Sequence, residues 1–454
     1  MFAKSLESFG DRTALIAEDG QSLAYSELAA RADGLFTEAT FAPRQLLALE
    51  CENSVDSVLA YLGALRNDFP VLLVDGQLDA ALRERLYSHF SVSCVRRAGE
   101  WKTLGHATPV VHPDVAILLS TSGSTGSPKL VKLTAGSLDA NARSIAQYLE
   151  LDEHERPITT LPMHYSYGLS VLNSHLSVGA TIVLTGQPVT ARKFWDMFRE
   201  HEATSLAGVP TIYTMLKQLR FERMNLPSLR TMTQAGGRLA PETIRWYAEL
   251  AASREQRFFV MYGQTEATAR MSYVPAHRAL EKSGSIGISI PGGCFDLVGE
   301  DGRPVDTAGE TGELRYRGPN VMMGYAACAA DLADADGQGG VLLTGDLARR
   351  DDDGYYHIVG RLKRFIKVFG NRVGLDEVEA QLREDGYDVA VTGRDDLMVV
   401  AWLGEGNDTG ALGSHISAKY RLHLSAIRVY AVDKFPLSTS GKVQYAELLK
   451  TLCP

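Results

Sequence analysis

Short apolar runs that alternate with helical patterns constrain the fold of this chain most strongly. Leu46–Leu49 and Val71–Val74 read as strands, and Ser54–Leu65 between them has the apolar spacing of a helix. A strand, a helix and a second strand in this order predict a unit of parallel sheet. We therefore predict an α/β fold with a large N-terminal domain of doubly wound sheets. Further strands are predicted in this domain at 180–184, 206–210, 230–233 and 258–261.

The composition and the length of the apolar runs change near residue 284. Glycine and proline become frequent and the apolar runs become short, which predicts a small β-rich subdomain at 284–361. We place a domain boundary between Leu362 and Lys363, giving a core of 1–362 and a small α+β C-terminal domain of 363–454. Two helices and one strand are predicted in the C-terminal domain, at 375–383, 414–424 and 397–403.

Composition excludes several classes of protein. The net charge of −9 and the lack of a basic block argue against a nucleic-acid partner. The five cysteines are scattered and form no CxxC pair, which favours a reducing compartment over a disulfide framework or a zinc site. No signal-peptide core and no run of about 18 apolar residues occurs, so no membrane span is expected. We expect a cytoplasmic protein.

A loop rich in small hydroxyl residues, TSGSTGSPK, lies between two apolar runs. Val115–Leu119 reads as a strand entering the loop and Lys129–Leu133 as a strand leaving it, so the loop is not a Walker motif, which runs into a helix. Backbone N–H groups of such a loop form a concave anion site, which hydroxyl groups and a lysine would reinforce. Phosphate binding is therefore predicted, and a serine-rich surface hairpin is the alternative.

A second motif, MYGQTE, follows the predicted strand at 258–261. It therefore lies at a strand end, where ligands of open α/β sheets bind. Tyr262 offers a flat face for a base, Thr265 a hydroxyl group, and Glu266 a carboxylate for a magnesium ion, which needs only one or two protein carboxylates. The alternative is a strand-to-helix turn with a capping glutamate.

Two further motifs lie towards the C-terminus. Asp346, in TGD, could accept two hydrogen bonds from a ribose diol. The acidic run 351–354 resembles a metal site, but its Asp-Gly pair favours a hairpin turn. Lys442 lies on a glycine-containing loop, PLSTSGKV, and its alternative interpretation is an ordinary solvent-exposed lysine.

Taken together, the motifs TSGSTGSPK, YGQTE, TGD, GYYHIVGRLKRFIKVFGNRV and PLSTSGKV resemble those of the adenylate-forming superfamily, in the same order and spacing. This superfamily contains acyl-CoA synthetases, adenylation domains of peptide synthetases and beetle luciferases. The resemblance covers nearly the whole chain, from residue 121 to 443. It implies that a carboxylate attacks the α-phosphate of ATP to give an acyl-adenylate, with Mg²⁺ as cofactor. A thiol, from coenzyme A or from a separate carrier protein, then displaces AMP.

The resemblance also implies roles for matched residues. Lys442 would bridge the substrate carboxylate and the α-phosphate, and Lys363 lies at the hinge about which the family rotates its C-terminal lid domain. Glu266, with Thr121, would bind magnesium, and Asp346 with Arg361 would hold the ribose hydroxyls. The remaining nucleotide-binding residues implied are Thr121, Ser122, Gly123, Ser124, Thr125, Gly126, Lys129, Ala235, Gly236, Gly237, Tyr262, Gly263, Gln264, Thr265 and Ile358.

The segment LPMHYSYGLS matches the part of the family that frames the substrate carboxylate. Tyr165 aligns with the gating residue, and Ser166 and Tyr167 follow it at the substrate. Members that activate amino acids carry an aspartate at the position of Ser166, because a buried ammonium group needs a paired carboxylate. A carboxylic acid without an α-amino group is therefore expected, unless another residue supplies the charge. The pocket is also expected to include Ser170, Asn173, Val209 and Met271, whose mixed polarity suggests a small or hydroxylated acyl group.

Alternatives remain at this stage. The chain could be a stand-alone amino-acid-activating enzyme, or a non-catalytic nucleotide-binding relative. His164 and His175 could contact substrate, but a lone histidine near an apolar turn is more often structural.

Overall fold

The computed structural model describes residues 1–37, 41–120, 129–362, 364–368, 371–404, 408–420, 422–438 and 442–453. The chain forms two compact units. The first contains Met1–Thr121, Ser127–Phe295 and Tyr316–Leu342, and the second contains Asp296–Arg315 and Leu343–Pro454. The predicted boundary between Leu362 and Lys363 stays a prediction. Among the described residues, no helix has the length and apolar character needed to cross a membrane.

The larger sheet of the first unit has nine described strands, and those in its centre are parallel. The run from β1 through β10, β9, β11 and β12 to β13 is parallel, and antiparallel strands close both edges. Consecutive parallel strands place their carboxyl ends along one edge of the sheet. In spatial order the strands are β15 (Ile288–Ser289), β14 (Ser272–Val274), β13 (Arg257–Tyr262), β12 (Thr231–Gln234), β11 (Ser205–Gly208), β9 (Pro157–Ile158), β10 (Ile182–Val183), β1 (Thr13–Ile16) and β2 (Ser22–Ala24).

The second sheet of this unit has seven described strands. Its central strands β5, β3, β4 and β7 are parallel, whereas β6, β8 and β18 run antiparallel to their neighbours. In spatial order the strands are β18 (Gly324–Ala326), β8 (Leu130–Thr134), β7 (Val115–Ser120), β4 (Val71–Asp75), β3 (Leu47–Cys51), β5 (Cys94–Arg97) and β6 (Glu100–Thr103).

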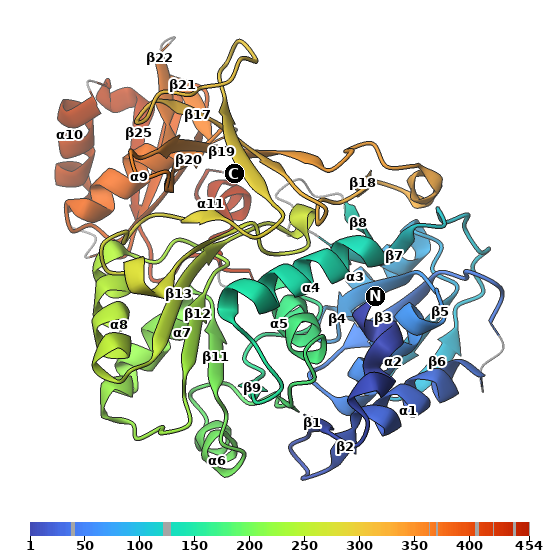
Figure 1. The fold of residues 1–454 in the computed structure, drawn as a ribbon. Coiled ribbons are helices and arrows are strands. Elements are labelled where there is room, and N and C mark those ends of the chain that lie inside the picture. Colours follow the sequence, from blue (N-terminus) through green and yellow to red (C-terminus); the bar gives the residue numbers. More distant parts are fainter. Residues whose placement is uncertain are drawn as a thin grey trace. The chain divides into compact units, whose positions relative to one another are not determined.

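Two helices, α4 (Ala135–Leu149) and α5 (Ser166–Leu176), lie between the two sheets (Figure 1). They pack on each other, α4 also contacts β7 and β8, and α5 contacts β10. Every residue of α5 is buried, as expected for a helix with a sheet on one side and a helix on the other. The other helices of this unit are α1 (Tyr25–Thr37), α2 (Val55–Arg66), α3 (Ala80–His89), α6 (Arg192–Glu200), α7 (Pro210–Gln218) and α8 (Pro241–Ser253).

Local sequence explains where the helices begin. Thr134 and Ser137 form a capping box that starts α4 directly after β8. The Ser54 side chain accepts a hydrogen bond from the Ser57 N–H and starts α2. Pro210 occupies the first turn of α7, where its missing N–H costs nothing.

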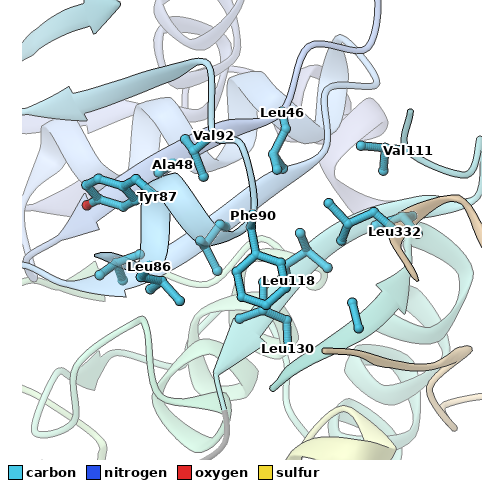
Figure 2. Packing of buried hydrophobic residues seen from close by; sticks show 14 of the residues in the cluster. Leu46, Ala48, Leu86, Tyr87, Phe90, Val92, Val111, Leu118, Leu130 and Leu332 are labelled. Atoms are coloured by element: carbon cyan, nitrogen blue, oxygen red, sulfur yellow. The ribbon is translucent and has the colours of Figure 1, made fainter. Parts of the chain in front are cut away.

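The hydrophobic core on one side of the seven-stranded sheet includes a residue from a later segment of the chain. Phe90, which is fully buried at the end of α3, packs with Leu118 of β7 and Leu130 of β8 (Figure 2). Leu332 joins the same cluster from the segment Tyr316–Leu342. That segment also supplies β18, so it is an integral part of the sheet.

The second unit contains a four-stranded sheet, most of whose residues belong to this unit, a two-stranded sheet and a three-stranded sheet. Helices α9 and α10 pack on the three-stranded sheet around a core that includes Val378, Val391 and Ile416. The strands are β16 (Cys294–Val298), β17 (Thr311–Arg317), β19 (Val341–Arg350), β20 (Tyr356–Arg361), β21 (Phe365–Val368), β22 (Asn371–Gly374), β23 (Val389–Arg394), β24 (Leu397–Trp402) and β25 (Ile427–Ala431). The helices are α9 (Leu375–Glu384), α10 (Thr409–Tyr420) and α11 (Tyr445–Leu452).

The α/β prediction is confirmed, and so is the strand–helix–strand unit, which is β3, α2 and β4. The acidic run 351–354 is a hairpin turn between β19 and β20, in which Gly354 has φ +85° and its N–H donates to the Asp351 carbonyl. Three predicted elements have clearly different bounds. The strand expected at 180–184 is only Ile182–Val183, and the helix expected at 414–424 is Thr409–Tyr420. The strand expected at 206–210 is Ser205–Gly208, and Pro210 begins α7 instead.

Candidate active site

The strands on either side of the predicted phosphate loop are antiparallel neighbours, as expected. Ser120 of β7 is opposite Leu130 of β8. The loop residues Thr121, Ser122, Gly123, Ser124, Thr125 and Gly126 lie outside the described residues, so their role stays a prediction. Lys129, directly before β8, is exposed, and its Nζ lies 6.0 Å from the centre of the Tyr325 ring. This distance suits a cation–π contact.

Tyr325 connects this lysine to the predicted metal ligand. Strand β18 places Tyr325 opposite Val131 of β8. The Tyr325 hydroxyl donates a hydrogen bond to Glu266 Oε1 at 2.7 Å, and the Glu266 carbonyl accepts one from the Met322 N–H at 2.8 Å. Burial, with the neighbouring Glu266 carboxylate, raises the pKa of Tyr325, so the phenol keeps its proton as donor. An ammonium group, an aromatic ring and a carboxylate therefore form one contiguous cluster.

This cluster fits a magnesium ion bound to ATP. Glu266 Oε2 has no hydrogen-bond partner among the described residues, so one carboxylate oxygen is available. The described part of the chain contains no group of three or more acidic, histidine or cysteine side chains that could hold a metal ion alone. Magnesium commonly binds through one or two carboxylates, with phosphate oxygens and waters completing its shell.

The YGQTE segment forms a tight turn at the carboxyl end of β13. The Met271 N–H donates to the Tyr262 carbonyl, so the chain folds back on itself. A Cβ on Gly263 would lie 1.6 Å from the Ala269 carbonyl oxygen, which leaves room only for glycine. Thr265–Ala267 is a single 3₁₀ turn without a side-chain cap, so the alternative of a capping glutamate is wrong.

The start of α5 meets this turn. Ser166 Oγ lies 3.2 Å from Thr265 Oγ1, and Ser166 is buried. Tyr165 lies beside Gly236: a Cβ there would be 2.5 Å from the tyrosine hydroxyl, and Gly236 has φ +85°. Burial raises the pKa of Tyr165 to about 12, so it is a neutral phenol at physiological pH. The structure thus brings together four residues that the sequence predicted for substrate and nucleotide.

Tyr167 and the segment after β12 have well-defined partners. The Tyr167 hydroxyl donates to the Thr233 carbonyl at 2.9 Å, so its polar end is directed into the sheet. The Ala235 N–H donates to the Gly208 carbonyl at 3.2 Å, and Gln234 Nε2 donates to the Gly237 carbonyl at 2.9 Å. These bonds fix the Ala235–Gly237 backbone at the carboxyl end of β12. Next to it, at the end of β13, Gln264 Nε2 donates to the Tyr262 hydroxyl.

The predicted ribose-binding pair lies in the second unit. Asp346 of β19 and Arg361 of β20 are opposite each other, and Arg361 Nε donates to Asp346 Oδ1 at 3.0 Å. The Asp346 side chain is 5% exposed and that of Arg361 is 59% exposed, so the carboxylate is buried and most of the arginine side chain faces solvent. Ile358, on β20 opposite Ala348, is half-buried.

The predicted catalytic lysine also lies in the second unit. Lys442 is exposed, and a small antiparallel bridge joins Leu437 to Val443 on either side of its loop. The Ser438 N–H donates to the Lys442 carbonyl, and the Lys442 N–H donates to Ser438 Oγ at 3.1 Å. Lys363, at the predicted hinge, lies outside the described residues.

Two residues of the site were missed by the sequence reasoning, Tyr325 and Arg270. Tyr325 lies 59 residues after Glu266, and only the pairing of β18 with β8 brings them together. Arg270 is 2% exposed and lies over the Tyr167 ring at 5.0 Å. Arg270 is the one charged residue of the sequence between MYGQTE and the end of β14, and this was the available signal. His175 is buried, and its Nδ1 bonds the Val171 carbonyl within α5.

The sequence of this chain is similar to those of known proteins that act on carboxylic acids and coenzyme A. The AMP-binding enzyme family matches residues 86–326. An indoleacetate–CoA ligase of Aromatoleum aromaticum is 33% identical over 353 residues, which are 74% of this chain and 67% of that protein. An oxalate–CoA ligase of Arabidopsis thaliana is 27% identical over 96% of this chain and 95% of its own.

Solved structures show the same fold. The O-succinylbenzoate coenzyme A synthetase of Bacillus subtilis has a TM-score of 0.81 in complex with AMP, at 23% identity, over 98% of this chain and 97% of its own. In complex with ATP and a magnesium ion the same synthetase has a TM-score of 0.79, at 23% identity, over 98% of both chains. The chain described here belongs to the AMP-binding enzyme family and is an AMP-forming acid–thiol ligase.

Proposed function

We propose that this ligase activates a carboxylic acid without an α-amino group at the start of α5 and transfers the acyl group to coenzyme A. The observation that carries the proposal is the contact between Ser166 and Thr265, 3.2 Å apart. It joins the segment that frames the carboxylate to the YGQTE turn. At this buried position the chain has a hydroxyl group rather than the carboxylate that an ammonium group would need.

The proposed roles follow from the charges involved. The substrate carboxylate and the α-phosphate are both negative, so they react only where fixed positive groups offset that charge. Lys129 and Mg²⁺ held by Glu266 would neutralise the outer phosphates, and Lys442 would act between the carboxylate and the α-phosphate. Asp346 and Arg361 would hold the ribose.

Coenzyme A is proposed as acceptor because the two relatives described above are both coenzyme A ligases. A separate carrier protein bearing phosphopantetheine presents the same thiol, so it is the competing acceptor. Magnesium and ATP are proposed as cofactors from the Glu266–Tyr325 geometry and from the neighbour that binds both.

The test is ATP–pyrophosphate exchange over a panel of acids, followed by product analysis with coenzyme A or a phosphopantetheinylated carrier protein. We expect exchange with one class of acid that lacks an α-amino group, and an acyl-CoA product. Exchange stimulated best by an α-amino acid would overturn the choice of substrate. Transfer to the carrier protein but not to coenzyme A would overturn the choice of acceptor.

A further inference from the structure

The turn that carries Glu266 contains two consecutive non-glycine residues with a left-handed backbone. Thr268 has φ +57° and Ala269 has φ +99°. Residues with a Cβ adopt such angles at an energetic cost, and these conformations persist only where the surrounding structure holds them. Both residues are buried, and they lie between Glu266 and β14. The conformation of this turn therefore depends on contacts from outside it.

Asn320 supplies such contacts at both ends of the strained pair. Its Nδ2 donates to the Ala267 carbonyl at 2.7 Å and to the Arg270 carbonyl at 3.1 Å. The Thr268 hydroxyl donates to the Asn320 carbonyl at 2.6 Å. One asparagine from the later segment Tyr316–Leu342 thus bonds to residues before, within and after the left-handed backbone.

The orientation of the Asn320 amide is fixed by its neighbours. The two carbonyl oxygens can only accept hydrogen bonds, so the amide nitrogen must face them. Its Oδ1 accepts a hydrogen bond from the Tyr316 hydroxyl at 2.8 Å. Asn320 is 1% exposed, and a Cβ on Gly318 would lie 2.7 Å from its Oδ1. Both polar atoms of the amide therefore have partners in a tightly packed site, and only one orientation satisfies them.

The same segment also holds Glu266 directly. Two residues beyond Asn320, the Met322 N–H donates to the Glu266 carbonyl at 2.8 Å. The Tyr325 hydroxyl donates to the Glu266 side chain at 2.7 Å. The segment Tyr316–Leu342 therefore bonds the side chain of Glu266, its carbonyl and the strained backbone that follows it.

We propose that Asn320 is a positioning residue of this ligase, which holds the Thr268–Ala269 backbone and thereby the position of Glu266. It acts through the turn and not by contact with ATP or acid. The inference rests on the function proposed above, in which Glu266 binds magnesium. The Asn141 amide also donates to the Arg270 carbonyl, at 2.9 Å, whereas Asn320 bonds the Ala267 carbonyl next to Glu266 as well.

The first test is the magnesium dependence of pyrophosphate exchange. Asn320→Ala removes both amide donors, so we expect the magnesium concentration for half-maximal exchange to rise at least tenfold. At saturating magnesium the rate should stay within threefold of the wild type. Tyr316→Phe keeps both donors and removes only the bond at Oδ1, so its rise should be smaller. An unchanged magnesium requirement in Asn320→Ala would overturn the proposal, as would a rate that falls equally at all magnesium concentrations.

Gln256→Ala is the matched control. Gln256 directly precedes β13, and its Nε2 donates to the Leu229 carbonyl at 3.0 Å. It is thus also a side-chain amide that bonds backbone, at the opposite end of the strand that leads into the YGQTE turn. We expect this variant to lose stability and to keep the wild-type magnesium requirement. A higher requirement in Gln256→Ala as well would show that the requirement follows stability, which contradicts the proposal.

The strained backbone provides a second test. Glycine adopts positive φ angles about as readily as negative ones, so Ala269→Gly should make the turn less dependent on Asn320. We expect Asn320→Ala to raise the magnesium requirement at least threefold less in the Ala269→Gly background than in the wild type, and to cost less stability in urea denaturation. Equal effects in the two backgrounds would show that Asn320 does not act through this backbone, and would overturn the proposal.

Glu266→Gln separates this inference from the function on which it rests. If this variant raises the magnesium requirement and Asn320→Ala does not, the positioning role fails while the proposed metal site stands. If Glu266→Gln leaves the requirement unchanged, the proposed metal site fails. Urea denaturation then decides the role of Asn320, because a smaller loss of stability in the Ala269→Gly background supports it and an equal loss overturns it.

Discussion

The phenol of Tyr325 is hydrogen-bonded to Glu266 Oε1 at 2.7 Å, across 59 residues of sequence. Tyr325 is on β18, which pairs with β8, and β8 follows the predicted phosphate loop directly. The pairing of β18 with β8 thus places Tyr325 next to both Glu266, the proposed magnesium ligand, and Lys129, which directly precedes β8. Glu266 accepts a hydrogen bond from a neutral donor at one oxygen, which leaves its second oxygen for the proposed magnesium ion.

Replacing Tyr325 by phenylalanine should weaken the binding of magnesium at Glu266. A hydrogen bond to a charged group contributes about 1.5 kcal/mol, which corresponds to roughly tenfold in a binding constant. We expect the magnesium concentration for half-maximal pyrophosphate exchange to rise about tenfold in Tyr325→Phe. The control is Tyr25→Phe, which removes a buried tyrosine hydrogen bond to the Ala180 carbonyl. An unchanged magnesium dependence in Tyr325→Phe would contradict this role.

Replacing Gly263 by alanine should distort the YGQTE turn. The new methyl group would lie 1.6 Å from the Ala269 carbonyl oxygen, so the backbone has to move. We expect a loss of about 3 kcal/mol in the free energy of unfolding, measured by urea denaturation, since overpacking against backbone has no side chain that can yield. Gly34→Ala in α1 is the control: its Cβ meets nothing within 4 Å, and alanine should stabilise the helix slightly.

His175 should make stability depend on pH. Burial, the largest cause, lowers its pKa to about 4, and the nearby Arg270 acts in the same direction. Between pH 6.5 and pH 4 the unfolded chain takes up a proton at this ring that the folded chain does not. The stability contribution is therefore complete above pH 6.5 and decreases as the pH falls, by up to about 3 kcal/mol.

This dependence is measured by urea denaturation at pH 7 and pH 5. His175→Asn keeps a donor for the Val171 carbonyl but cannot be protonated, so its stability should fall less between the two pH values than that of the wild type. His154→Asn, at an exposed position, should behave like the wild type. Equal pH slopes for the wild type and His175→Asn would show that this ring is not the titrating group.

Replacing Lys442 by alanine should separate the two steps of the reaction. We expect adenylate formation to fall at least 100-fold, because loss of one group that stabilises the transition state commonly costs that much. Transfer to the thiol from a supplied acyl-adenylate should continue. The control is Lys434→Ala, which removes another exposed lysine of the second unit. Pyrophosphate exchange at the wild-type rate in Lys442→Ala would refute the role.

The sequence predicted those parts of the fold that have a strong local pattern. Val71–Val74 is apolar throughout because β4 is buried between two parallel neighbours, so its position was clear. The first turn of α10 was not predicted from the sequence, because Gly410 and Gly413 lie in it or directly after it and glycine has a low helix propensity. The helix forms there because Leu412 and Ile416 pack into the core of the second unit. Pro210, expected at a strand end, begins α7.

For the site, the sequence predicted residues within motifs and missed those between them. Ser166 and Thr265 were each expected near the substrate, but their contact depends on how α5 meets the end of β13. Tyr325 and Arg270 lie outside every motif and act through long-range pairing. Local patterns carry no information on such contacts, because these arise from strand order and packing.

The loop that carries Lys442 is closed by its own backbone. The Leu437–Val443 bridge, the two bonds between Ser438 and Lys442, and the bond from the Gln444 N–H to the Pro436 carbonyl hold both sides of the loop together. The conformational entropy lost in ordering the lysine backbone is therefore lost when the second unit folds, and not when ATP and acid meet. If Lys442 has the role proposed for it, a substitution that opens the bridge should lower the rate of adenylate formation even with the lysine intact.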